Sequence, residues 1–239
     1  MSGDLIDTTE MYLKTVFELR EAGVVPMRAR IAERLGHSGP TVSQTVARME
    51  RDGLLHLDAE RRIRLTDEGR QIATAVMRKH RLAERHLLDV IGLDFALVHE
   101  EACRWEHVMS LAVEERIAQQ LEPPYVDPYG NPIPGLQSLG IAETAITPDG
   151  KDQSNALETL ADVATAGEHV RVRLERIGER AQSDPELLGE LARHGLFPGA
   201  EVQMGEQGGS AVLQVGDGDP LLLDDITAGQ LLVTRIAAG

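Results

Sequence analysis

The chain has 239 residues, of which 42% are hydrophobic, and this is enough to build two or three small domains with cores. No run of eighteen apolar residues occurs, and the first residues do not form a charged-then-apolar leader, so we expect a cytoplasmic protein with no membrane partner. Because Cys103 is the single cysteine, an internal disulfide is excluded.

The formal net charge of −15, taken whole, argues against binding to nucleic acid. The charge is unevenly divided along the chain, however. Residues 1–90 contain 15 Lys and Arg and 14 Asp and Glu, whereas residues 91–239 carry a net charge of −16. Any surface that binds DNA phosphates is therefore expected in the first third of the chain.

The N-terminal part of the sequence predicts the element order of a winged helix-turn-helix. Apolar residues recur there at helical spacing, and Gly or Pro interrupts each run. Two short alternating segments then predict a hairpin that forms the wing. The expected elements are helices at Leu5–Glu21, Arg28–Leu35 and Ser38–Asp52 and strands at Leu54–Leu57 and Ile63–Leu65.

The next part of the chain predicts a helical domain, followed by a region of β structure. Prolines end the helical pattern, a polar segment rich in Ala, Thr and Ser follows, and alternating apolar residues among many glycines then favour a small barrel with one short helix near Pro185–His194. Helices are expected at Thr66–Ile91, Ala96–His107 and Ser110–Leu121. The predicted domains are a winged helix at 1–72, a helical domain at 73–140, a linker at 141–166 and a small β-barrel at 167–239.

The third predicted helix is the candidate for reading DNA, because the first turn of this helix faces base edges in helix-turn-helix proteins. Gln44 can pair with adenine, and small polar side chains can contact a thymine methyl group. Arginines on both sides could bind phosphates, although a helix-turn-helix used only for packing would also carry a solvated arginine face. The candidate residues are Ser38, Pro40, Thr41, Ser43 and Gln44 for bases and Arg28, Arg30, Arg48 and Arg51 for phosphates.

Metal-ligating residue types cluster between positions 80 and 107. Cys103, Glu106 and His107 have i, i+3 and i+4 spacing, which places them on one face of a helix. A thiolate, a carboxylate and an imidazole together suit a borderline transition metal, although each is also common without one. His80 and Glu84 form a second pair that is either a surface ion pair or, with His99, part of a second site.

Five segments of the sequence closely resemble the diphtheria toxin repressor and iron-dependent regulator (DtxR/IdeR) family. The resemblance is dense over residues 4–136 and looser beyond residue 165. The segments are Asp7–Leu13, Ser38–Leu54, Ala75–Arg85, Glu101–Ser110 and Asn131–Leu136.

The resemblance implies two metal sites and a dimeric repressor, in which residues 73–140 form the dimerisation and metal-binding domain and residues 167–239 form an SH3-like (FeoA-like) β-barrel domain. The implied primary site consists of Met11, Cys103, Glu106 and His107. The implied ancillary site consists of His80, Glu84 and His99, to which the SH3-like domain adds Glu179 and Gln182 from a Glu-x-x-Gln motif. The implied partners are a second copy of the chain and a palindromic operator of double-stranded DNA in genes of iron uptake and storage.

Ligand chemistry gives further guidance on the metal. Manganese prefers carboxylates, carbonyls and water, whereas a site with Met11 and Cys103 is softer and should favour Fe(II), Co(II) or Ni(II). Zn(II) would bind the same atoms, and cellular availability favours Fe(II). The alternatives are a regulator that responds to Mn(II) or another metal and, in another class, a metal-dependent hydrolase. The sequence contains no His-Glu-x-x-His, P-loop or Gly-x-Ser-x-Gly motif, so we expect no enzyme and no small-molecule substrate.

Two further expectations concern mechanism. Met11 lies on the first helix and the other primary ligands some ninety residues away, so metal should fix the N-terminal segment, including Thr8, where a winged helix meets phosphate. The C-terminal domain is expected to act as a clamp on the ancillary site through Glu179 and Gln182, and the alternative is that both are ordinary surface residues at a strand end. The competing use of this domain is to dock on Asn131–Pro134, whose prolines suit an SH3-like groove.

Overall fold

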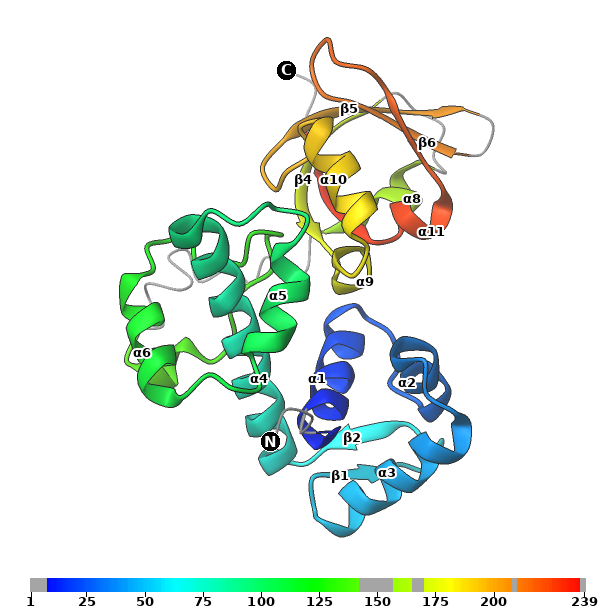
Figure 1. The fold of residues 1–239 in the computed structure, drawn as a ribbon. Helices are drawn as coiled ribbons and strands as arrows, with labels where there is room; N and C mark the ends of the chain where they lie inside the picture. The colour runs from blue at the N-terminus through cyan, green and yellow to red at the C-terminus, as the bar shows by residue number, and fades with distance from the viewer. Residues whose placement is uncertain (1–7, 142–156, 165–169, 208–209, 237–239) are drawn as a thin grey trace. The chain divides into compact units, whose positions relative to one another are not determined.

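The computed structural model describes residues 8–141, 157–164, 170–207 and 210–236, which form two compact units (Figure 1). Unit 1 comprises residues 1–80 and 103–116, and unit 2 comprises residues 81–102 and 117–239. The expected helical domain is thus divided between the two units. No helix of the described ranges is long and apolar enough to cross a membrane.

Unit 1 contains the winged helix-turn-helix that the sequence predicts. Ser38 accepts a hydrogen bond from the Thr41 N–H, and Pro40 occupies the first turn of the third helix, so the predicted cap is confirmed. Leu55 pairs with Leu65 across the wing hairpin. Residues 5–7 of the first expected helix lie outside the described residues. The elements are α1 (Thr8–Glu21), α2 (Arg28–Leu35), α3 (Gly39–Arg51), β1 (Leu55–Leu57) and β2 (Ile63–Leu65).

The core of unit 1 forms where the apolar stripes of α1, α2 and α3 meet the wing. Leu13, Ile31, Val42, Met49 and Ile63 are fully buried there. Met11 and Phe17 pack against this core from α1 without being completely covered. The first helix therefore packs on the core that it shares with α2, α3 and the wing.

Three helices follow the wing, and their ends differ in detail from the expectation. The long helix was expected to reach Ile91 but changes to a π-helical turn over Leu87–Ile91, and Gly92 at φ 73° ends that turn. The helix expected to reach His107 ends at Trp105. The three helices are α4 (Asp67–His86), α5 (Val98–Trp105) and α6 (Leu111–Gln120).

Unit 2 contains the predicted C-terminal β domain as a six-stranded antiparallel sheet. The strand order is β3-β8-β4-β5-β6-β7, and the described residues show no pairing that joins the two edge strands. The SH3-like architecture is thus confirmed, with the barrel left open. The strands are β3 (Glu158–Thr159), β4 (Val170–Ile177), β5 (Glu201–Gln207), β6 (Ser210–Gln214), β7 (Leu221–Leu223) and β8 (Leu231–Arg235).

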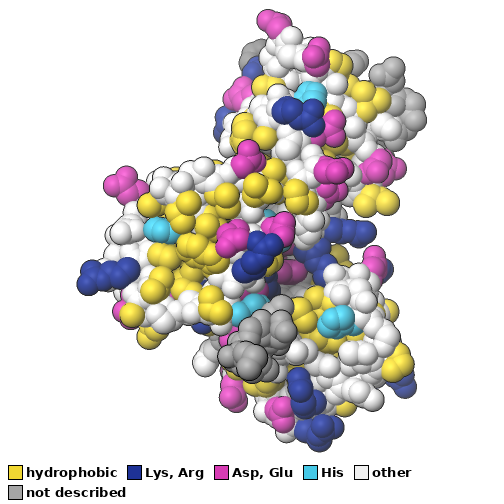
Figure 2. Space-filling model, viewed as in Figure 1, with side chains coloured by type: hydrophobic (Ala, Val, Ile, Leu, Met, Phe, Trp, Pro, Cys, Tyr) yellow, Lys and Arg dark blue, Asp and Glu magenta, His cyan; other side chains and the backbone are white. Residues whose placement is uncertain are grey.

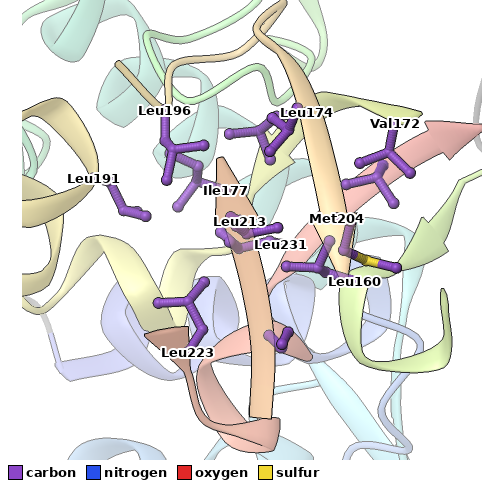
Figure 3. Packing of buried hydrophobic residues seen from close by; sticks show 14 of the residues in the cluster. Leu160, Val172, Leu174, Ile177, Leu191, Leu196, Met204, Leu213, Leu223 and Leu231 are labelled. Carbon is purple, nitrogen blue, oxygen red and sulfur yellow. The ribbon is translucent and has the colours of Figure 1, made fainter. Parts of the chain in front are cut away.

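Leucine and valine side chains from the concave side of this sheet fill the core shown in Figure 3. Val172, Leu174 and Ile177 alternate along β4, and Leu213 and Leu231 reach the same cluster from β6 and β8. Short helices close the core around the sheet. They are α8 (Leu160–Ala164), α9 (Glu179–Gln182), α10 (Pro185–Arg193) and α11 (Asp225–Ala228).

Part of the segment expected as a linker is structured. Leu160 and Val163 of α8 are buried in the C-terminal core, and α8 packs against β5, β6 and β8. Apolar residues two or three positions apart in so short a stretch give no clear periodicity, and this is why the sequence did not reveal the helix. Residues 142–156 of the same segment lie outside the described residues.

Candidate metal centres and DNA-reading surface

The side chains proposed to read bases lie at the start of α3. Ser38, Pro40, Thr41 and Gln44 are exposed, whereas Ser43 is half-buried. Val42, Val46 and Met49 point into the core from the opposite face, so the amphipathic pattern orients the polar face outwards. The structure therefore brings the five expected base-reading residues together on one short segment.

The arginines around α3 differ in their surroundings. Arg30, Arg48 and Arg51 are exposed and Arg28 is half-exposed, and Arg30 donates a hydrogen bond to Glu33 at 3.0 Å. On the wing, Arg62 and Arg64 both donate to Asp58, which lies at the tip of the hairpin. These pairs are at the surface, where ion pairs contribute little to stability, so phosphate could replace the carboxylates at little cost.

The predicted primary residues of unit 1 surround a buried carboxylate. Glu106 is 3% exposed and lies in the turn just after α5, followed by His107. The His107 Nε2 atom lies 3.1 Å from Glu106 Oε1. Because α5 ends at Trp105, the expectation that Cys103, Glu106 and His107 share a continuous helix is wrong, although the turn still places the last two residues side by side.

Two residues of α1 that the sequence analysis missed contact this group. Lys14 Nζ donates to Glu106 Oε2 at 2.7 Å and lies 3.9 Å from Cys103 Sγ. Glu10 Oε2 lies 2.9 Å from His107 Nδ1. Lys14 could have been suspected because it stands within the buried run from Tyr12 to Val16, where a lysine needs a charged partner.

His80, expected in the ancillary set, also reaches Glu106. Its Nδ1 atom lies 2.6 Å from Glu106 Oε2 and 3.1 Å from Lys14 Nζ. The structure thus brings His80 to the predicted primary residues within unit 1. His80 shares helix α4 with Glu84, one turn further along.

Electrostatics hold this group in a charged state. Burial alone would raise the pKa of Glu106, but the charges of Lys14 and His80, with hydrogen bonds from His107 and His80, hold that pKa well below its usual value. Hydrogen bonds to Glu10 and Glu106 raise the pKa of His107 to about 9. A buried carboxylate that is ionised, with a thiol and two imidazoles at hand, has the chemistry of a transition-metal site.

The predicted ancillary residues of unit 2 also converge. His99 Nδ1 lies 3.0 Å from Glu84 Oε1 and 4.0 Å from Glu179 Oε2. The alternative that Glu179 and Gln182 are surface residues at a strand end is wrong, because they form the short helix α9, which follows β4. The helix places both side chains in the interior, where Glu84, Glu179 and Gln182 are 0%, 7% and 1% exposed.

The donor set in unit 2 fits a divalent cation. Within the described part of the chain, Gln182 Oε1 is buried and has no hydrogen-bond partner, while its Nε2 atom donates to the Ile177 carbonyl at 2.7 Å. Burial, with the negative charge of Glu84, raises the pKa of the neighbouring Asp127 to about 8. A bound cation would stabilise both the buried amide oxygen, which lacks a donor, and the excess of buried carboxylates.

Comparisons with known proteins agree along the whole chain. Three family models match, described as the N-terminal DNA binding domain of iron dependent repressors at residues 4–62, their metal binding and dimerisation domain at residues 66–135 and the FeoA domain at residues 159–235. The diphtheria toxin repressor of Corynebacterium glutamicum is 49% identical over 93% of this chain and 94% of its own. The iron-dependent repressor IdeR of Mycobacterium tuberculosis is 52% identical over 87% and 88%.

Solved structures give the same result. A manganese-dependent transcriptional repressor in complex with manganese has a TM-score of 0.75 and 26% identity, covering 96% of this chain and all of its own. ScaR with bound Zn²⁺ has a TM-score of 0.73 and 29% identity over the same shares. Fold and family models together define a metal-dependent, DNA-binding repressor.

The chain belongs to the DtxR/IdeR family of iron-dependent repressors. This family consists of transcriptional repressors rather than enzymes, and the hydrolase interpretation is set aside on that ground.

Proposed function

We propose that this chain is an Fe(II)-activated, dimeric transcriptional repressor that binds palindromic operators of iron-homeostasis genes in the cytoplasm. One observation supports this most strongly. On α1, Glu10 contacts His107 and Lys14 contacts Glu106, and Met11 lies between these two residues. Metal bound by Met11, Cys103, Glu106 and His107 would thus tie α1 to the segment after α5.

This connection would couple metal binding to DNA binding, because α1 packs on the core to which α3 also belongs. Metal would fix α1 and the residues before it, with Thr8 near phosphate, while Ser38, Pro40, Thr41, Ser43 and Gln44 read bases. Arg28, Arg30, Arg48 and Arg51 would bind phosphates. A hundredfold activation needs a coupling free energy of about 2.7 kcal/mol, a modest demand on one coordination site.

Fe(II) is proposed from the softness of the donors. The thioether of Met11 and the thiolate of Cys103 favour Fe(II), Co(II) and Ni(II) over Mn(II), and Zn(II) remains a substitute that affinity alone does not exclude. Mn(II) is the second candidate because several similar structures are of proteins named as manganese regulators. His80, Glu84, His99, Glu179 and Gln182 would supply the ancillary site, and the contact of His80 with Glu106 suggests that this histidine can serve either set.

Dimerisation is proposed through the helical region, in line with the matching dimerisation model. Val108, Leu111 and Val113 of unit 1 are 81%, 58% and 48% exposed, which is unusual for neighbouring large apolar side chains. Figure 2 shows hydrophobic side chains gathered over the region of α6. A twofold dimer fits a palindromic operator. We propose the domain boundaries given above, with the C-terminal domain beginning at β3 rather than at residue 167.

The test is DNA binding by the full chain with and without metal. Mobility shift on a palindromic operator should need Fe(II) under anaerobic conditions and disappear with a chelator. Met11→Ala should impair activation while circular dichroism stays unchanged, and Met27→Ala, an exposed methionine beside α2, is the matched control. Equal affinity for the operator in metal and in chelator would contradict the proposal.

A further inference from the structure

A tight turn at residues 126–132 is closed by one buried carboxylate. Val126 pairs with Pro132 across the turn, and Asp127 is 2% exposed. The Asp127 carboxylate accepts hydrogen bonds from the Tyr129 N–H at 2.8 Å, the Asn131 N–H at 2.9 Å and the Asn131 amide at 3.0 Å. The turn therefore has a fixed shape with its polar groups satisfied inside.

This turn lies directly on the end of β4. The Ile177 N–H donates to the Tyr129 carbonyl at 2.8 Å, and the Asn131 amide donates to the Ile177 carbonyl at 3.1 Å. Gly130 has φ +86°, and a Cβ atom there would lie 2.0 Å from the Glu175 carbonyl oxygen. Only glycine permits so close an approach of the two backbones.

The Tyr129 side chain anchors the turn in the C-terminal core. It is fully buried in the same hydrophobic cluster as Leu174 and Ile177, and its hydroxyl donates to the Phe95 carbonyl at 2.9 Å. The Phe95 ring packs at a tilt against Tyr129 and edge-on against Phe197. The hydrogen bonds of this turn with Ile177 at the end of β4 come from Tyr129 and Asn131, and Gly130 supplies the close approach to Glu175.

Arg81 connects the same turn to α9. Its guanidinium donates to the Pro132 carbonyl at 2.6 Å and to Glu179 Oε1 at 2.8 Å, and its Nε atom lies 3.3 Å from Asp127 Oδ2. Arg81 is fully buried, so its charge is balanced by these two carboxylates. One side chain of α4 thus holds both the turn and a predicted ligand.

The Ile177 carbonyl connects the turn to Gln182, which is the second predicted ligand on α9. The Ile177 carbonyl accepts both from Asn131 and from Gln182 Nε2. This leaves Gln182 Oε1 as the atom available to a cation, while Arg81 holds one oxygen of Glu179 and leaves the other facing His99.

We propose that the turn at 126–132, together with Arg81, is a latch that positions Glu179 and Gln182 for the ancillary metal. Gly130, Asn131 and Arg81 are positioning residues in this arrangement and do not touch the metal. The inference rests on the proposed ancillary site and explains how one docking contact serves that site. Docking on this segment and clamping of the metal are then one function.

The test compares two glycines in the full-length protein. Gly130→Ala places its Cβ against the Glu175 carbonyl, whereas Gly140→Ala, at φ +85° with no atom within 4 Å, carries the same backbone strain without the contact. Titration with Co(II) should show affinity at the ancillary site, which lacks the Cys103 thiolate, reduced about 10- to 100-fold in Gly130→Ala and unchanged in Gly140→Ala. The absorption of Co(II) bound to the Cys103 thiolate should be the same in both.

Asn131→Ala tests the latch in case Gly130→Ala misfolds, and a double variant of Glu179 and Gln182 separates failure of the latch from failure of the ancillary site. Asn131→Ala removes only the amide that bridges Asp127 and Ile177, and should weaken the same site while the melting temperature of the C-terminal domain changes little. If Gly130→Ala and Asn131→Ala both bind Co(II) like wild type, the latch is wrong. In that case, loss of Co(II) binding at the ancillary site in the double variant Glu179→Ala, Gln182→Ala would still support that site, and no loss would overturn the site as well.

Discussion

Lys14 is an internal cation beside the predicted primary residues, and replacing it should have opposite effects on the metal-free and metal-bound protein. The ammonium donates to Glu106 at 2.7 Å and is almost completely buried. Lys14→Met keeps the unbranched stem of the side chain up to the Cε position and removes the charged ammonium. Loss of one partner of a buried ion pair costs about 3–5 kcal/mol, and we expect about 3 kcal/mol because His80 and His107 still contact Glu106.

In chelator, this loss should lower the melting temperature by about 6–12 °C, since about 1 kcal/mol corresponds to about 2–4 °C in a chain of this size. A divalent cation neutralises Glu106 in place of the ammonium. The metal should therefore bind Lys14→Met more tightly than wild type, by up to about a hundredfold if all of the 3 kcal/mol is recovered.

The assay is anaerobic titration with Fe(II) or Co(II), alongside thermal melts with and without metal. Lys79→Met is the matched control, because Lys79 lies on α4 and is only partly buried. If Lys14→Met binds metal no more tightly than wild type, Lys14 does not compete with the cation and the electrostatic account of the group is wrong.

Three further predictions follow from the same residues. Cys103→Asp should weaken activation by Fe(II), Co(II) and Ni(II) more than activation by Mn(II), because it replaces the softest donor; a uniform loss in operator binding across metals would mean that Cys103 is only structural. Gln44→Ala should lose about 1–3 kcal/mol of binding free energy, and the loss should depend on the base at one operator position. Arg48→Ala should weaken binding to all sequences alike and lower the slope of log affinity against log salt concentration by about one. An equal loss for Gln44→Ala on every operator variant would refute base reading by Gln44. In chelator, the pKa of His107 is raised from 6.5 to about 9, so its bonds to Glu10 and Glu106 stabilise the fold fully below about pH 6.5 and this stability is lost as pH rises through 9. The difference in melting temperature between wild type and Glu10→Gln should therefore shrink over that range. A difference that stays constant would contradict this prediction.

The sequence predicted those features that depend on local physics. Helical periodicity and the Ser38 cap located α3 to within a residue, and alternation located the wing. These signals work because the apolar stripe and the N-cap act within a few residues of one another. The expectation that Met11 shares a site with residues near position 103 came only from the family resemblance, because no local pattern contains it.

The features that the sequence did not predict depend on contacts between distant segments. Lys14 and Glu106 are 92 residues apart, and nothing near either one identifies its partner. The end of α5 before Glu106 and the docking of Gly130 on Glu175 are set by tertiary packing rather than by propensity. Gly130 was visible in the sequence only as a turn residue, because its close approach to β4 involves a strand that begins forty residues later.

The most direct test of the account is whether metal and operator strengthen each other equally. Binding free energies are reciprocal, so if Fe(II) tightens operator binding by a given factor, the operator must tighten Fe(II) binding by the same factor. Fe(II) affinity of the full-length protein should be measured anaerobically with and without a saturating palindromic operator. The account predicts tighter Fe(II) binding on the operator, abolished in Met11→Ala; equal Fe(II) affinity in both conditions would contradict it.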